Sequence, residues 1–151
     1  MNNIKAILFD WGETLHDPKG GKLFEGVPEL LTALSEKYVL ALISLAASES
    51  TEERRKRIED SGVANYFKVI LVDDKDKDGM YEKALAVLQV KAEAVAIVDD
   101  RVVRGIAWGN RHGAMTIRVQ RGKYVGEMPS NETEEPQITL KNVVELKNIL
   151  L

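Results

Sequence analysis

Five short runs of apolar residues, rich in β-branched side chains, recur along the chain at residues 4–9, 38–43, 68–72, 94–98 and 115–119. Each run has the length of a typical strand. The runs are nearly continuous rather than alternating between apolar and polar residues, as expected for strands that are covered on both faces. The pattern therefore predicts five buried β-strands.

Stretches with a helical pattern separate these runs, at residues 27–37, 51–61, 80–88 and 103–112. Ser50 and Glu53 have the spacing of a capping box at the start of the second stretch. Gly62 and Gly113 occur where the ends of two helices are expected. Strands that alternate with helices indicate a parallel sheet wrapped by helices. The predicted fold class is α/β, a three-layer Rossmann-like parallel sheet of about five strands with no cap domain.

The length of 151 residues suits a single domain, which we expect to span residues 1–151. Residues 130–137 are polar and acidic and contain one proline, which is typical of a loop. Residues 141–151 have the pattern of a last helix. We therefore expect residues 130–151 to form a C-terminal loop and helix that pack on the core.

Composition and charge exclude several functional classes. The formal net charge is −3, which gives no general attraction to nucleic acid or to anionic membranes. No apolar run approaches the roughly 18–20 residues of a membrane span, and the first residues lack the pattern of a signal peptide. The chain has no cysteine, so disulfides and thiolate chemistry are excluded. We expect a cytoplasmic protein with no membrane or nucleic-acid partner.

Reactive side chains follow several of the predicted strands. Asp10 follows the first run, Ser44 the second, and Asp99 and Asp100 the fourth, while acids and lysines alternate through residues 73–78 after the third. In parallel α/β sheets, ligands bind beyond the carboxyl ends of the strands. Carboxylates gathered there would repel one another unless a hard cation such as Mg²⁺ binds between them. Lysine and hydroxyl groups could then hold a phosphate, and an aspartate could accept its phosphoryl group.

Four motifs occur in chain order over about the first 120 residues. They are residues 10–14 (Asp-Trp-Gly-Glu-Thr), Ser44, a lysine at position 75 or 77, and the Asp99-Asp100 pair. Together they resemble the haloacid dehalogenase-like hydrolase superfamily. The spacing to Tyr81 favours Lys75 over Lys77 as the lysine of the third motif.

The resemblance implies a Mg²⁺-dependent phosphohydrolase in which Asp10 attacks the phosphoryl group and forms an aspartyl-phosphate. Ser44 and the lysine would hold the phosphate oxygens. The implied metal ligands are Asp10, the backbone carbonyl of Gly12, Asp99 and Asp100. The candidate substrate-binding residues are Thr14, Trp11 and Arg101.

The sequence departs from the family pattern at two positions. The usual general acid, two residues after the nucleophile, is replaced by Gly12, and such a group typically contributes roughly 10²–10⁴ in rate. Glu13 is the candidate substitute acid or base, and His16 is a second one. Gly105 replaces a further acid downstream of the fourth motif, for which Asp99 could compensate. We therefore expect weak or selective activity.

The segments after the first two motifs are too short for an inserted cap, so the site should be open, with residues 16–25 as the only candidate flap. The substrate would be a phosphorylated small molecule or a larger phosphorylated partner, and a second copy of the chain could cover the site. Residues 52–57 are interpreted as a solvated helix face. The alternative function is a catalytically degenerate domain that binds a phosphorylated ligand or protein. A dehalogenase, which uses no metal, fits the paired acids less well.

Overall fold

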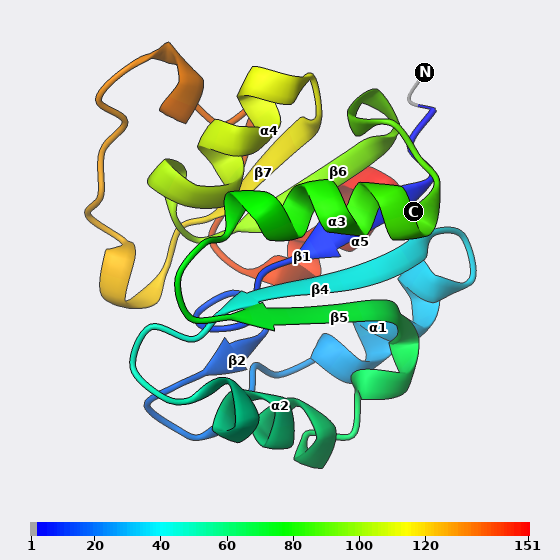
Figure 1. Ribbon diagram of the computed structural model, residues 1–151, viewed down its shortest axis with the longest axis vertical. Helices are drawn as coiled ribbons and strands as arrows, with labels where there is room; N and C mark the ends of the chain where they lie inside the picture. Colours follow the sequence, from blue (N-terminus) through cyan, green and yellow to red (C-terminus); the bar gives the residue numbers. More distant parts are fainter. Residues whose placement is uncertain (1–2) are drawn as a thin grey trace.

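A six-stranded sheet runs through the centre of the molecule, with helices on both faces (Figure 1). The computed structural model describes residues 3–151. Every pair of neighbouring strands in this sheet is parallel, and the spatial order is β5-β4-β1-β6-β7-β8. The strands are β1 (Ala6–Phe9), β4 (Val39–Leu45), β5 (Phe67–Asp73), β6 (Val95–Asp99), β7 (Met115–Val119) and β8 (Ile138–Leu140). The predicted α/β class with a parallel, helix-wrapped sheet is confirmed.

Five α-helices are found in the described residues 3–151, and none of them is long and apolar enough to cross a membrane. The predicted capping box of Ser50 and Glu53 is present at the start of the second helix. Gly62 and Gly113 adopt positive φ angles (85° and 84°) where two helices end, a conformation that glycine adopts without a steric cost. The helices are α1 (Val27–Ser35), α2 (Thr51–Asp60), α3 (Asp78–Leu88), α4 (Ala107–His112) and α5 (Lys147–Leu150).

Successive side chains of each strand point to opposite faces of the sheet and so build two cores. In β1, Ile7 and Phe9 belong to one core, and Ala6 and Leu8 belong to the other. The first core is completed by residues of α1, α2 and the C-terminal segment, and the second by residues of α3 and α4. Because both faces are covered, the strands read as continuous apolar runs in the sequence.

The main differences from the predicted elements lie in the C-terminal half. A sixth strand, β8, pairs with β7. The predicted last helix is a 3₁₀ turn over Val143–Leu146 that continues into the short α5. The stretch predicted as one helix from residue 103 to 112 is a helical turn over Val102–Ile106, kinked at Arg104, followed by α4.

The segments that follow the first two motifs are short in the structure. Between Thr14 and α1 the chain forms a small antiparallel hairpin of β2 (His16–Asp17) and β3 (Lys22–Leu23). Between β4 and β5 lie only α2 and a 3₁₀ turn over Ala64–Tyr66. Neither of these described segments contains a cap, and the carboxyl ends of the central strands stay uncovered by an inserted domain.

Candidate active site

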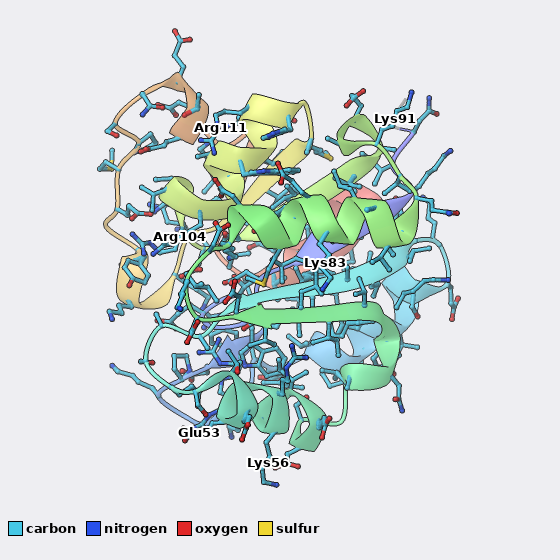
Figure 2. All side chains as sticks on the ribbon, viewed as in Figure 1. Glu53, Lys56, Lys83, Lys91, Arg104 and Arg111 are labelled. Atoms are coloured by element: carbon cyan, nitrogen blue, oxygen red, sulfur yellow. The ribbon has the colours of Figure 1, made fainter. Side chains whose placement is uncertain are left out.

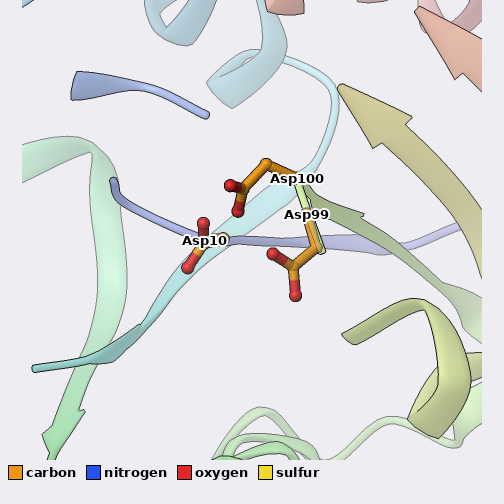
Figure 3. A group of neighbouring side chains, drawn as sticks. All are labelled: Asp10, Asp99 and Asp100. Atoms are coloured by element: carbon orange, nitrogen blue, oxygen red, sulfur yellow. The ribbon is translucent and has the colours of Figure 1, made fainter. Parts of the chain in front are cut away.

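Three aspartates meet at the carboxyl ends of the two central strands (Figure 3). Phe9 of β1 pairs with Val98 of β6, so Asp10 follows β1 beside the end of β6, where Asp99 and Asp100 lie. Carboxylate oxygens of the three aspartates all lie within 4.8 Å of one another, and all three side chains are buried. The sheet therefore brings together the three acids that the sequence analysis assigned to a metal ion.

The lysine that reaches this acidic group is Lys77, and Lys75, which the sequence spacing favoured, does not reach it. The Lys77 Nζ donates to Asp10 Oδ1 at 2.8 Å and to Asp99 Oδ2 at 3.0 Å, and the side chain is only 4% exposed. Lys75 lies on the exposed part of the loop after β5. The difference arises because Lys77 immediately precedes α3, where the chain turns back over the strand ends, whereas Lys75 is still in the outer loop.

The buried charges do not balance without a cation. Burial, together with the neighbouring Asp10 and Asp99 carboxylates, raises the pKa of Asp100 to about 11. Burial also raises the pKa of Asp10, although Lys77 opposes this effect. The pKa of Asp99 is lowered despite burial, because Lys77 donates to it. One lysine therefore cannot hold three ionised carboxylates at neutral pH, and a divalent cation with oxygen ligands fits this donor set.

Asp99 fills the space that a side chain at position 105 would need. The Gly105 N–H donates to Asp99 Oδ2 at 2.7 Å. A Cβ atom at position 105 would meet the Tyr81 hydroxyl first, and it would lie 2.7 Å from Asp99 Oδ2 and 2.9 Å from Ile97 Cγ2, closer than real Cβ atoms approach. With Asp99 in this position, only glycine fits at position 105, so the absence of an acid there accompanies the presence of Asp99.

The turn after Asp10 holds that carboxylate in place. The Thr14 Oγ1 donates to Asp10 Oδ2 at 3.1 Å, so the two carboxylate oxygens of Asp10 each have a donor, from Thr14 and from Lys77. Thr14 is completely buried, so its hydroxyl contacts Asp10 and is not exposed to a substrate. At Gly12, a Cβ atom would meet no other atom within 4 Å. The position of the usual acid is therefore open space.

Two residues of this turn do not lie as the sequence suggested. Trp11 was a candidate substrate-binding residue, but it is 1% exposed and belongs to the first hydrophobic core. Glu13 has a positive φ of 65°, and its carboxylate accepts from the backbone N–H of Lys123 at 2.6 Å. The carboxylate of Glu13 would have to release this bond to act as an acid or base.

His16, the second candidate acid, packs against Trp11 with ring centroids 5.1 Å apart. Burial lowers the pKa of His16, so its ring stays neutral at pH 7. His16 is the first residue of β2 in the hairpin, and in residues 3–151 no hydrogen bond joins its ring to Asp10.

Ser44 is completely buried within β4, and its hydroxyl accepts a hydrogen bond from Arg54 Nη1 at 2.7 Å. Arg54 was not identified from the sequence, because residues 52–57 were interpreted as a solvated helix face. A signal was available, since Arg54 lies one turn before Ile58, the buried residue of α2, and so shares its face. In contrast, Lys56 points away from the molecule (Figure 2).

The predicted substrate contact Arg101 is bound to a carboxylate. Its Nε and Nη2 donate to Glu127 Oε2 at 3.0 and 2.7 Å, and its guanidinium stacks on the Tyr124 ring. Arg104 lies on the same side of the site, at the carboxyl-terminal edge of the sheet (Figure 2). A substrate would therefore meet Arg101 only together with Glu127.

A cavity of about 280 Å³ opens above the acidic group. It contains the predicted nucleophile at its base and basic side chains along its walls. Its lining residues are Asp10, Gly12, Glu13, Pro18, Leu45, Ala47, Ser48, Arg54, Lys77, Asp99, Asp100, Arg101, Arg104, Lys123 and Tyr124.

The sequence matches a known protein family over most of its length. The family described as haloacid dehalogenase-like hydrolase matches residues 1–119. The chain is 24% identical over 129 residues to a protein named glyceraldehyde 3-phosphate phosphatase from Methanopyrus kandleri. This alignment covers 82% of the chain and 54% of the relative, so the chain spans about half the length of that curated protein.

Solved structures support the same fold. A haloacid dehalogenase-like family protein from Streptococcus pneumoniae superimposes with a TM-score of 0.83, at 16% identity and with 100% of both chains covered. The HAD-type hydrolase YfnB from Bacillus subtilis, described as bound to magnesium, gives a TM-score of 0.71 at 22% identity, covering 87% of this chain and 57% of that one. At these identities, the likeness concerns the fold alone.

Proposed function

This chain belongs to the haloacid dehalogenase-like hydrolase family, and on that premise we propose that it is a Mg²⁺-dependent phosphohydrolase with Asp10 as its nucleophile. The observation that carries the proposal is the position of Asp10. Its carboxylate lies at the base of an open cavity, contacts Lys77 and Thr14, and has Asp99 and Asp100 within metal-binding distance. The curated relative named as a phosphatase supports the same class of reaction.

Asp10 would act in two steps. A carboxylate oxygen of Asp10 attacks the phosphorus atom, the bond from phosphorus to the leaving oxygen breaks, and an aspartyl-phosphate forms. Water then attacks that phosphorus atom, the bond from phosphorus to the Asp10 oxygen breaks, and inorganic phosphate and the free carboxylate form while the proton of the water passes to solvent. Lys77 and Thr14 hold the carboxylate in one orientation before the attack, because they contact different oxygens of it.

The ligands proposed for Mg²⁺ are Asp10, Asp99, Asp100 and the backbone carbonyl of Gly12. The bound cation supplies the positive charge that allows the three carboxylates to ionise together and that offsets the charge of the phosphoryl group. The raised pKa of Asp100 supports this assignment, because a bound cation would favour the ionised form of that carboxyl near neutral pH.

The missing acid at Gly12 limits which esters can react quickly. A leaving group that departs as a stable anion needs no proton, whereas an alkoxide does. We therefore propose a phosphatase that favours phosphorylated small molecules with good leaving groups. The open space at Gly12 also supports the second candidate function, a domain that binds phosphorylated ligands without turning them over.

The decisive test is steady-state hydrolysis of p-nitrophenyl phosphate and acetyl phosphate, with Mg²⁺ and with EDTA. We expect turnover of both labile substrates with Mg²⁺ and none with EDTA, because the acidic group is not fully ionised without the cation. Absence of turnover by folded protein in both conditions would contradict the phosphohydrolase and support the ligand-binding alternative.

Lys77 is expected to be required for this activity and Lys75 is not. Replacing Lys77 with Met removes the only lysine that contacts Asp10 in the described residues 3–151 and should lower kcat/KM by about 10²- to 10³-fold, as for loss of one oriented charge-stabilising donor. Lys75→Met, which changes an exposed side chain of the same type in the same loop, is the matched control. The reverse order of effects would restore Lys75 as the third-motif lysine.

A further inference from the structure

Arg54 is a largely buried arginine that the four motifs do not include. Its side chain is 13% exposed and reaches from α2 to the end of β4. Its Nε donates to Glu49 Oε2 at 2.7 Å, and its Nη1 donates to Ser44 Oγ at 2.7 Å and to the Leu45 carbonyl at 3.3 Å. These contacts fix the plane of the guanidinium group before any ligand binds.

One nitrogen of Arg54 remains available for a ligand. In the part of the chain that the structure describes, Nη2 donates to no protein atom, although the other two guanidinium nitrogens are both engaged. Nη2 is also not among the fully buried donors that lack a partner, whereas Trp11 Nε1 is. Arg54 lines the cavity that has Asp10 and Lys77 at its base, so the available donor belongs to a wall of that cavity.

Arg54 occupies the route from Ser44 to the cavity. Ser44 is completely buried and is not among the residues that line the cavity, whereas Arg54 lines it and covers the Ser44 hydroxyl. A phosphate group above Asp10 would therefore meet the guanidinium before it could meet the hydroxyl. The contact that the sequence analysis assigned to Ser44 is available from Arg54.

The guanidinium group of Arg54 has the charge and the geometry to bind an anion. Glu49 accepts from both Arg54 and Arg57 at 2.7 Å, so one carboxylate is shared by two guanidinium groups, and Glu53 is a second carboxylate that acts on Arg57. Lys77, in contrast, is surrounded by carboxylates. A phosphate monoester carries close to two negative charges at pH 7, and an arginine fork matches the geometry of its oxygens.

We infer that Arg54, oriented by Glu49, binds the phosphoryl oxygens of the substrate and so adds a fifth element to the four motifs. The inference rests on the proposed function for its substrate class, a dianionic phosphate monoester. A purely structural role, in which Arg54 only ties α2 to β4, would account for its Nε and Nη1 bonds. That role gives no reason for phosphate affinity to depend on Arg54.

The test measures phosphate affinity and turnover separately, in the full chain with Mg²⁺. Inorganic phosphate is titrated by calorimetry into the wild type, Arg54→Gln and Arg54→Lys, and KM and kcat are measured with p-nitrophenyl phosphate. We expect Arg54→Gln to weaken phosphate binding and raise KM by about 10- to 100-fold, the range for loss of a hydrogen bond to a charged group. Arg54→Lys should recover part of this loss, because it keeps the charge without the fork.

Two controls separate binding from folding. Arg55→Gln changes the exposed neighbouring arginine of the same helix and should leave phosphate affinity and KM unchanged. Arg54→Ala should regain part of its phosphate affinity when millimolar guanidinium is added, an effect that a structural role would not produce. Thermal unfolding of each variant checks that the variant is folded at the assay temperature.

The outcomes distinguish this inference from the proposed function. Turnover by the wild type, with unchanged phosphate affinity and KM in Arg54→Gln, would overturn the role of Arg54 and leave the phosphohydrolase intact. Arg54-dependent phosphate binding without any turnover would support Arg54 and overturn the phosphohydrolase. Neither turnover nor phosphate binding by the wild type would overturn both.

Discussion

Replacing Asp10 with Asn is expected to lower turnover of p-nitrophenyl phosphate by about 10⁴- to 10⁶-fold, the loss seen when a covalent catalyst loses one of its reacting groups. The neutral amide oxygen is a far weaker nucleophile than the carboxylate. The amide would also weaken the group of oxygens that we assign to Mg²⁺, since only one oxygen remains at this position. The measurement is kcat/KM at saturating Mg²⁺.

The Asp10→Asn protein should still fold, because Asn has the shape of Asp and can keep both contacts. Its carbonyl oxygen can accept from Lys77, while its amide can donate to the Thr14 hydroxyl, which accepts as well as donates. Asp10→Ala is a second variant, because slow deamidation of Asn would restore Asp and Ala cannot do so. Asp74→Asn, on the exposed loop after β5, is the matched control. More than a tenth of the wild-type activity in both Asp10 variants would exclude Asp10 as the nucleophile.

The architecture could be predicted because its signals are local and repeated. Strands covered on both faces read as continuous apolar runs, and β7 was predicted with the bounds that the structure has. Strand β8 was not predicted, because it has only three residues and lies between an acidic loop and a short C-terminal turn. Such a segment pairs because β7 offers it an unpaired edge, which no pattern within three residues can reveal.

The acidic part of the site could also be predicted, since parallel strands bring their carboxyl ends to one edge. The lysine and the arginine could not be predicted in the same way. The choice between Lys77 and Lys75 depends on where the loop turns into α3, a tertiary property. The role of Arg54 depends on which face of α2 is turned toward the sheet, and a single buried apolar residue, Ile58, was a weak indication of that face.

Placing Asp at position 12 is expected to raise the rate on alkyl phosphates by about 10²- to 10⁴-fold, the usual contribution of a general acid or base. The side chain can be accommodated, because a Cβ atom at position 12 meets nothing within 4 Å and the φ angle is not positive. The gain should be smaller with p-nitrophenyl phosphate, whose leaving group departs without a proton. The measurement is the ratio of kcat/KM values for an alkyl and a nitrophenyl ester in Gly12→Asp and in the wild type.

Gly12→Asn tests whether this gain comes from proton transfer, because its side chain has the same size but cannot supply an acid. An equal gain in Gly12→Asn would contradict a catalytic acid at position 12. No gain in Gly12→Asp would mean that another group already moves the proton, and Glu13 is the nearest candidate despite its bond to the Lys123 amide. Glu13→Gln then separates the two cases. If Glu13 substitutes for the missing acid, its removal lowers the rate when position 12 is Gly but has little effect in the Gly12→Asp background, because two groups that perform the same step are not additive.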